Sequence, residues 1–229
     1  MGRASAAFAK SLRAARHAGA LVALCVALAA ATLPAVAATT VKDDAALKPP
    51  TGARIAIIEF DDLQCPACAM VNPLLVSAVS QYKIPLVRHD LLIPSHNWSR
   101  IAAINARWFD AQGKGLGDGY RNEVFANQSS IFNPLMLRQF TYQFAQSHGV
   151  TLPADMDPSG KLANEVEADR QLSLRTGVAL TPTIFIVTAG PDGNHYEEVT
   201  DHTKLFPLID AALAKLKSDA PAAGHKAKK

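Results

Sequence analysis

Cys65 and Cys68 form a Cys-x-x-Cys motif, the most reactive pattern of side chains in this sequence. They stand in "QCPACAM", separated by Pro66 and Ala67, just beyond a short apolar run. Two thiols at this spacing can form a redox pair, can supply half of a metal site, or can be small buried residues. A third cysteine, Cys25, lies in an apolar run near the amino terminus.

The first 37 residues are typical of a secretory signal peptide. Basic residues without any acid precede an apolar run over residues 20–33, and small residues stand at Ala35 and Ala37. We therefore expect cleavage near Ala37 and export of the mature chain. An uncleaved membrane anchor is the alternative, but the apolar run is short for a span and ends at Pro34. The leucine before Cys25 argues against a lipoprotein signal.

Removal of this segment changes both the charge and the cysteine count. The chain of 229 residues has 23 basic and 20 acidic residues, whereas residues 38–229 keep 19 basic and 20 acidic ones, which gives a net charge of about −1. A net charge near zero does not favour binding to nucleic acid. Residues 218–229 are expected to be a disordered basic tail. Cys65 and Cys68 remain alone in a compartment where disulfides persist. A bridge between them closes a very small loop and adds little stability, so reactivity is the favoured role.

A metal site at the two cysteines is the rival interpretation. Structural zinc needs four ligands, and Cys65 and Cys68 supply only two of them. The histidines of the mature chain show no paired spacing such as His-x-x-x-His. We therefore expect no metal and no organic cofactor. A metal-handling or peptide-binding protein remains the alternative of a different class.

The apolar pattern predicts a strand before the two cysteines and a helix after them. Residues 54–60 are a β-branched apolar run that predicts a buried strand, and from Pro66 the pattern becomes helical. The cysteines therefore lie at a strand-to-helix junction, and a second strand is expected within residues 84–93. The residues expected on one side of the helix are Met70, Leu74, Leu75 and Val79.

Residues 95–177 predict helices only, because no strand pattern occurs among them. Asn133-Pro134 predicts the start of the third of these helices, and Gly149 predicts its end. Asp157-Pro158 opens a fourth, polar segment that Gly177 closes. The apolar residues expected to line these helices are Ile101, Ile104 and Trp108, then Tyr120 and Val124, then Met136, Phe140 and Phe144.

The last third of the chain returns to strands. Residues 183–188 and 195–199 flank "AGPDGN", which predicts a hairpin. Residues 205–216 carry an amphipathic helical stripe, with Asp201 or Thr203 as its cap. The predicted order is β-α-β, a helical block, then β-β-α.

The strand-to-helix junction predicts unequal roles for the two thiols. Unpaired N–H groups and the positive end of the helix dipole stabilise a thiolate at Cys65. Cys68 lies one turn into the helix and is shielded. We therefore expect Cys65 to be the exposed sulfur in disulfide exchange and Cys68 to be the resolving thiol.

The pattern "EF-x4-CPAC-x4-P", the helical block and "GVALTPTIFIV" together resemble the DsbA branch of the thioredoxin superfamily. The resemblance covers about residues 53–217, and Cys-x-x-Cys alone would be a weak signal for it. It implies an α/β thioredoxin fold with an inserted all-helical domain. The implied division of the chain is signal peptide 1–37, leader 38–52, thioredoxin-like domain 53–94 and 178–217, helical domain 95–177 and tail 218–229.

The resemblance also assigns residues near the cysteines. Pro182 matches the cis-proline whose loop pairs with the backbone of a bound substrate segment, and Thr181 before it would contact substrate or the sulfurs. Ala67 stands where the best-known DsbA protein has histidine, so one stabiliser of the thiolate is missing. We therefore expect a Cys65 pKa below the free value but not extreme, and a potential between about −270 and −120 mV.

Glu59 matches the acidic residue that the family places six positions before the first cysteine. A carboxyl group in an otherwise buried strand should have a raised pKa and could take a proton from Cys68. The alternative is a solvated acid at the end of the strand, because Asp61 and Asp62 follow.

The activity implied is that of a periplasmic, monomeric dithiol oxidase that donates disulfides to secreted proteins with reduced cysteines. Its implied reoxidant is a quinone-linked membrane protein of the DsbB or VKOR kind. An isomerase or reductase is the alternative within the superfamily, where threonine before the cis-proline also occurs. Such isomerases are often oligomeric through an added domain, and the leader over residues 38–52 is short for one.

Overall fold

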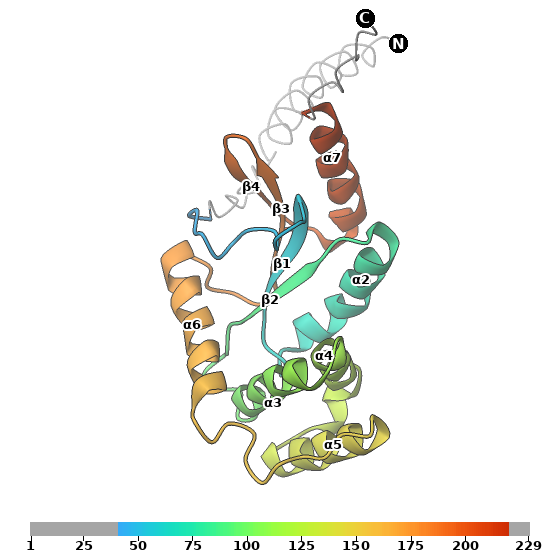
Figure 1. Ribbon diagram of the computed structural model, residues 1–229, viewed down its shortest axis with the longest axis vertical. Helices are drawn as coiled ribbons and strands as arrows, with labels where there is room; N and C mark the ends of the chain where they lie inside the picture. Colours follow the sequence, from blue (N-terminus) through green and yellow to red (C-terminus); the bar gives the residue numbers. More distant parts are fainter. Residues whose placement is uncertain (1–40, 220–229) are drawn as a thin grey trace, which may run out of the picture. The chain divides into compact units, whose positions relative to one another are not determined.

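The computed structural model describes residues 41–219, and the predicted signal peptide and most of the predicted tail lie outside this range (Figure 1). A four-stranded sheet with the order β2-β1-β3-β4 forms its centre. β1 runs parallel to β2 and antiparallel to β3, and β3 and β4 form the predicted hairpin. The strands are β1 (Ile55–Asp61), β2 (Leu86–Asp90), β3 (Thr183–Gly190) and β4 (Gly193–Glu198).

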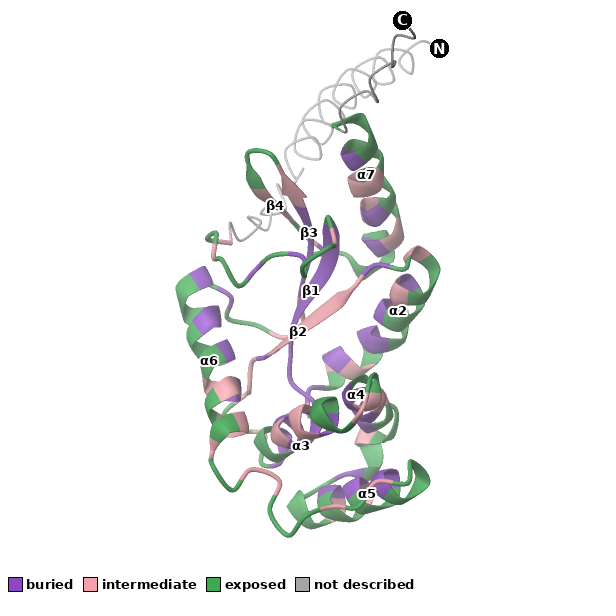
Figure 2. Cartoon of the chain, in the orientation of Figure 1, coloured by how far each residue is buried: buried purple, intermediate pink, exposed green. Residues whose placement is uncertain are grey.

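Helices cover both faces of this sheet (Figure 1). β1 is buried along its whole length (Figure 2), as expected for a central strand with apolar residues on both sides. Ile55 and Ile57 pack with residues of α2 (Pro66–Tyr82) and α7 (Leu205–Ser218). Ala56, Ile58 and Phe60 pack with Leu172 of α6 (Lys161–Thr176) on the opposite face. Odd-numbered residues of β1 therefore point towards α2.

The segment between β2 and β3 is helical throughout its regular structure, as predicted. Its apolar core includes Tyr120, Val124 and Phe144, and it also takes in both Cys65 and Cys68. The cysteines thus lie where the sheet domain meets the helical block. The remaining elements are α3 (Ser99–Gln112), α4 (Leu116–Asn127), η1 (Gln128–Ser130), α5 (Pro134–Ser147) and η2 (His202–Lys204).

Several local predictions agree with the structure. The Asn133 side chain accepts a hydrogen bond from the Met136 N–H at 3.0 Å, as an N-cap should. Asp201 accepts one from the Thr203 N–H, but it caps the short η2 turn before α7. In the part of the leader that is described, Leu47 is fully buried against the sheet.

The predicted stripe on α2 was wrong for Met70 only, because Leu75 is fully buried and Leu74 and Val79 pack against the same apolar cluster. Met70 is 79% exposed, whereas the neighbouring Val71 is buried. The helix begins at Pro66, which turns Cys68 inward, and the residues three, four and seven positions beyond Cys68 then lie on the buried side. The buried residues of α2 are Cys68, Val71, Asn72, Leu75 and Ala78.

The predicted stripe on α3 was shifted. Ile101 is 42% exposed, and Ile104 and Trp108 are only half-buried. The buried side instead carries small residues with one aromatic ring, which lets α3 approach its neighbours closely. The buried residues of α3 are Ser99, Ala102, Ala103, Asn105, Ala106 and Phe109.

Candidate active site

Cys65 is the N-cap residue of α2, and Pro66 occupies the first turn of the helix. The loop before Cys65 is held by the buried side chain of Asp62. Its carboxylate accepts hydrogen bonds from the N–H groups of Gln64 and Ile93, both at 2.7 Å. The Cys65 N–H donates to the Asp62 carbonyl at 2.8 Å. Asp62 therefore ties the cysteine loop to the segment that follows β2.

Gln128 fixes the same loop from the helical block. Its side-chain amide donates to the carbonyl of Leu63 at 2.9 Å and to that of Cys65 at 3.1 Å. Sequence reasoning missed Gln128, because nothing near it in the chain marks a contact with a motif some 63 residues away. The helical block thus helps to set the position of the first cysteine.

The two thiols are free and both are buried, so the expectation that Cys65 is the exposed sulfur was wrong: its relative exposure is 5%, because it packs in the apolar core of the helical block. Their pKa values are shifted in opposite directions. The pKa of Cys65 is lowered to about 5, chiefly because the Cys68 thiol donates a hydrogen bond to it, with help from Thr181 and the backbone N–H groups of Ala67 and Cys68. The pKa of Cys68 is raised, because it donates that bond, because it is buried, and because Asp61 repels its anion. Cys65 is therefore the thiolate at neutral pH, and Cys68 is the thiol.

The Thr181–Pro182 peptide bond is cis, and it lies beside the cysteines. In its thiol form Cys65 donates to the Thr181 carbonyl across 3.7 Å. The Thr181 hydroxyl is buried and makes no hydrogen bond to any other group of residues 41–219, which leaves it to stabilise the Cys65 thiolate. The structure thus brings Thr181 and Pro182 to the sulfurs, while the apolar residues Met70 and Leu180 nearby in sequence are exposed.

Glu59 is fully buried in β1, so the interpretation as a solvated strand-end acid was wrong. Burial raises the pKa of Glu59 to about 8; Arg88 opposes this rise, and Asp61 and Cys65 add to it. Asp61, two residues further along the strand, is 1% exposed. Burial also raises the pKa of Asp61, to about 6, against the attraction of Arg88.

Arg88 of β2 is the cation of this buried group. Its Nη1 lies 3.0 Å from Oδ2 of Asp61 and 3.5 Å from Oε2 of Glu59. Its Nη2 donates to Oδ1 of Asn72 at 2.6 Å, and its Cζ lies 5.6 Å from the centre of the Phe125 ring. Sequence reasoning missed Arg88, although a basic residue inside an apolar strand next to an acidic one was a signal for it.

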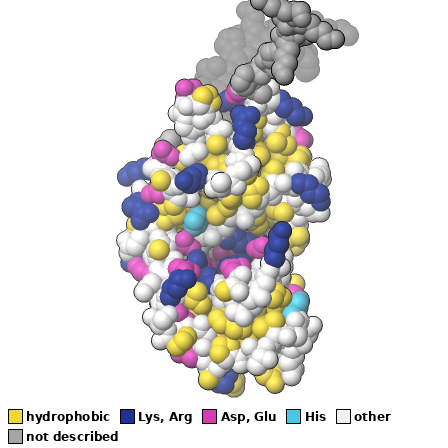
Figure 3. All heavy atoms as spheres, viewed as in Figure 1, with side chains coloured by type: hydrophobic (Ala, Val, Ile, Leu, Met, Phe, Trp, Pro, Cys, Tyr) yellow, Lys and Arg dark blue, Asp and Glu magenta, His cyan; other side chains and the backbone are white. Residues whose placement is uncertain are grey.

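A second buried ion network joins β2 to the helical block. Arg107 donates to Asp90 through Nε at 2.8 Å and through Nη2 at 2.6 Å, and it also contacts Asp169. His89 Nδ1 lies 2.8 Å from Asp169. Figure 3 shows charged side chains of both signs gathered in the middle of the face in view. Because Arg107, Asp90 and Asp169 belong to α3, β2 and α6, this network links the helical block to the edge strand of the sheet.

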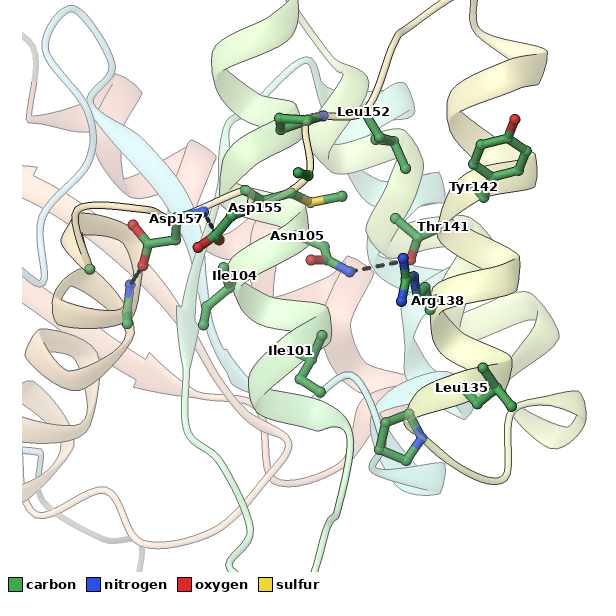
Figure 4. Close-up of a pocket in the computed structure, with 16 residues that line it drawn as sticks. Ile101, Ile104, Asn105, Leu135, Arg138, Thr141, Tyr142, Leu152, Asp155 and Asp157 are labelled. Atoms are coloured by element: carbon green, nitrogen blue, oxygen red, sulfur yellow. Dashed lines mark hydrogen bonds between the residues drawn. The ribbon is translucent and has the colours of Figure 1, made fainter.

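A cavity of about 930 Å³ lies in the helical block, between α3, α5 and the segment before α6 (Figure 4). Ile101, Leu135 and Tyr142 line it, and Asn105 donates to Thr141 across one side at 3.2 Å. The cysteines and the other predicted site residues are not among its lining residues. The cavity is therefore separate from the cysteine site.

Within residues 41–219, no group of three or more His, Cys, Asp and Glu side chains is arranged to hold a metal ion. No helix in this part of the chain has the length and apolar character needed to cross a membrane. The reactive groups of the site are two thiols of unequal acidity, Cys65 and Cys68, near the buried acids Glu59 and Asp61.

Solved structures of DsbA-type proteins resemble this structure. Alpha-DsbA1 of Wolbachia pipientis matches with a TM-score of 0.57 and 16% identity, over 74% of this chain and 92% of that one. Oxidised BdbD of Bacillus subtilis matches with a TM-score of 0.56 and 16% identity, over 74% and 91%. The thiol-disulfide exchange protein alpha-DsbA2 of Wolbachia pipientis matches with a TM-score of 0.57 and 18% identity, over 72% and 85%.

No model of a known protein family matches the chain. No curated protein matches it either. At identities this low, the likeness to solved structures establishes the fold. The predicted fold class is thereby confirmed as a DsbA-like thioredoxin fold with an inserted helical domain.

Proposed function

From this DsbA-like fold and its pair of unequal thiols, we propose that the chain is an exported thiol-disulfide oxidoreductase that donates disulfides to secreted proteins. The main support for this proposal is the unequal acidity of the two cysteines beside a cis-proline. Cys65 caps a helix beside the cis Thr181–Pro182 bond with its pKa lowered to about 5, while the pKa of its neighbour Cys68 is raised. A site with this asymmetry releases Cys65 readily as a thiolate and retains Cys68 as a thiol.

The reaction begins with Cys65 and Cys68 joined in a disulfide. A substrate thiolate attacks the sulfur of Cys65, a new bond forms between the two sulfurs, and the bond to Cys68 breaks. A second substrate thiolate attacks the substrate sulfur of this mixed disulfide and displaces Cys65. The substrate has then lost two electrons and holds a disulfide, and both cysteines are reduced.

Protonation of Cys68 is the difficult part of the first step. Cys68 leaves as an anion in a fully buried position, where a thiolate is disfavoured. Glu59, which keeps its proton to about pH 8, supplies a proton as Cys68 leaves and takes one back in the reductive direction. Its burial beneath α2 supports this role.

Thr181 and Pro182 are proposed to receive the substrate backbone. Their loop lies against Cys65, and a segment paired with it would bring its own thiol to that sulfur. Exposed Met70 and Leu180 would offer apolar contacts to side chains of an unfolded substrate. Pro66 and Ala67 complete the active-site motif.

The proposed partners and location come from the resemblance and the signal sequence. We expect a periplasmic monomer without metal or organic cofactor, reoxidised by a quinone-linked membrane protein. The disulfide isomerase or reductase function remains the alternative, because Thr181 before the cis-proline suits either direction.

Paired assays test the proposal. Oxidative folding of a reduced multi-disulfide protein is compared with reshuffling of a scrambled one, with Cys65→Ser as the blank. We expect fast oxidation and weak reshuffling. Strong reshuffling with poor oxidation would select the isomerase function. Tightly bound metal in the isolated protein, with no exchange activity, would select the metal-handling class.

A further inference from the structure

Two buried carboxyl groups and one guanidinium lie on the same side of the sheet, beneath α2. Glu59 and Asp61 share the face of β1 that Ile57 presents to α2, because side chains alternate along a strand. Arg88 is the parallel partner of Glu59 on β2, so it points to the same side. We call Glu59, Asp61 and Arg88 the acid-arginine cluster.

Within the acid-arginine cluster, Arg88 binds Asp61 more closely than Glu59. Its Nη1 is at hydrogen-bond distance from Asp61, 3.0 Å, but 3.5 Å from Glu59, which is long for a charge-assisted hydrogen bond. Its Nη2 is occupied by Asn72 at 2.6 Å. Neither carboxyl oxygen of Glu59 accepts a hydrogen bond from any residue between 41 and 219.

This arrangement determines where a single proton resides. A buried carboxylate without a hydrogen-bond donor is strongly disfavoured, and a neutral carboxyl group is tolerated more easily. One guanidinium balances one carboxylate. The cluster is therefore neutral when Asp61 is ionised against Arg88 and Glu59 is protonated.

We infer that Asp61 is a positioning residue for the proposed exchange reaction, because it engages Arg88 and so leaves the proton of the cluster on Glu59. The consequence of this arrangement is that Glu59 can supply a proton when Cys68 leaves the disulfide, and this consequence rests on the proposed function. Burial raises the pKa values of both acids, and Glu59 has the higher one, in agreement with the geometry.

The groups that face Asp61 come from several elements. Arg88 on β2 and Arg121 on α4 favour its ionised form, and Asp90 on β2 opposes it. On α2, the pKa of Cys68 is raised partly by the charge of Asp61. The two arginines outweigh the one acid, so Asp61 is the ionised member of the pair.

The groups that face Glu59 leave it protonated. Arg88 is the one cation that acts on it among the described residues, and it is already engaged by Asp61. Asp61 and the Cys65 thiolate both oppose ionisation of Glu59. In β3, the strand that pairs with the other edge of β1, the residue opposite Glu59 is the apolar Ile184, which adds no charge.

An Asp61→Asn substitution should therefore act on Glu59. The substitution removes a repelling charge and frees Arg88 for Glu59, so the pKa of Glu59 falls. Titration of the side-chain carboxyl carbons of ¹³C-labelled glutamate by NMR, in the full reduced chain, measures this pKa directly. The signal of Glu59 is identified by its loss in Glu59→Gln. We expect a drop of one pKa unit or more, which is a tenfold change in proton affinity.

Two further variants complete the experiment. Asp192→Asn, at an exposed position in the β3–β4 turn, should leave the pKa of Glu59 unchanged. Asn72→Asp places a second acid within reach of Arg88, so it should raise the pKa of Glu59. This variant tests the competition for Arg88 by a change of the opposite sign if Asp61→Asn does not fold. An unchanged Glu59 pKa in Asp61→Asn, or a Glu59 already ionised at neutral pH in the wild type, would overturn the inference.

The titration also separates this inference from the proposed function. A protein that titrates as expected but exchanges no disulfides supports the proton location and refutes the oxidoreductase. If the protein exchanges disulfides but the pKa of Glu59 is the same in the wild type and in Asp61→Asn, only the role of Asp61 is refuted.

Discussion

Glu59→Gln should make the folded protein more stable, and increasingly so as the pH rises. Glu59 is fully buried, and neither of its carboxyl oxygens accepts a hydrogen bond within residues 41–219. Glutamine has the shape of a protonated glutamic acid and cannot ionise. The substitution therefore removes a group whose charge is disfavoured and breaks no hydrogen bond that the structure contains.

The pH dependence follows from the shift in pKa. Folding raises the pKa of Glu59 from 4.5 to about 8, so the folded state binds more protons than the unfolded state between these values. The free energy of unfolding therefore falls as the pH rises through this window. Since one pKa unit corresponds to about 1.4 kcal/mol, the wild type should lose about 3 kcal/mol relative to Glu59→Gln between about pH 5 and pH 8.

Urea unfolding of both reduced proteins at a series of pH values gives this difference. Cys65 and Asp61 titrate in both proteins, so the difference between the two stability curves reports chiefly on Glu59. Glu197→Gln is the matched control, because Glu197 is an exposed glutamate on β4 and its substitution should leave the pH dependence as in the wild type. Parallel stability curves for the wild type and Glu59→Gln would refute the claim that Glu59 is protonated in the fold.

Three other expectations can be checked separately. The alkylation rate of Cys65 should follow a pH profile with a midpoint near 5, and a midpoint near the free-thiol value would contradict the site electrostatics. Cys68 in Cys65→Ser should react slowly at neutral pH, because burial and the charge of Asp61 still raise its pKa there. Gln128→Ala should lower the free energy of unfolding by about 1–2 kcal/mol, because two hydrogen bonds to the cysteine loop are lost; Asn127→Ala is the control, and equal effects would contradict this. A glutathione redox titration should place the Cys65–Cys68 couple between about −270 and −120 mV, and a value outside that window would refute the expectation for Ala67.

The order of elements and the place of the cysteines could be predicted from the sequence because they depend on local patterns. The apolar run before Asp61 predicts a strand, and the proline after Cys65 predicts the start of a helix. Neither prediction depends on tertiary contacts. Burial of Glu59 could also be anticipated, since its strand is apolar on both sides.

The contacts that tune the site could not be predicted in the same way. Arg88 meets Asp61 and Asn72 only because of the register between β1 and β2 and the rotation of α2 about its axis. The apolar pattern of α2 placed Leu75 correctly but not Met70, which is exposed. Gln128 reaches Cys65 through the packing of the helical block, which no local pattern encodes.

The proposed reaction requires that Cys65 forms the mixed disulfide and that Cys68 resolves it. A peptide that carries one disulfide is incubated with reduced Cys68→Ser, reduced Cys65→Ser and the reduced wild type, and after an acid quench mass spectrometry maps any mixed disulfide. In Cys68→Ser, attack by the Cys65 thiolate should release one peptide thiol and leave a stable mixed disulfide on Cys65. Little should accumulate in the wild type, because Cys68 displaces the peptide. A mixed disulfide that forms equally fast on Cys68 in Cys65→Ser, or none on Cys65, would contradict this assignment of the two thiols.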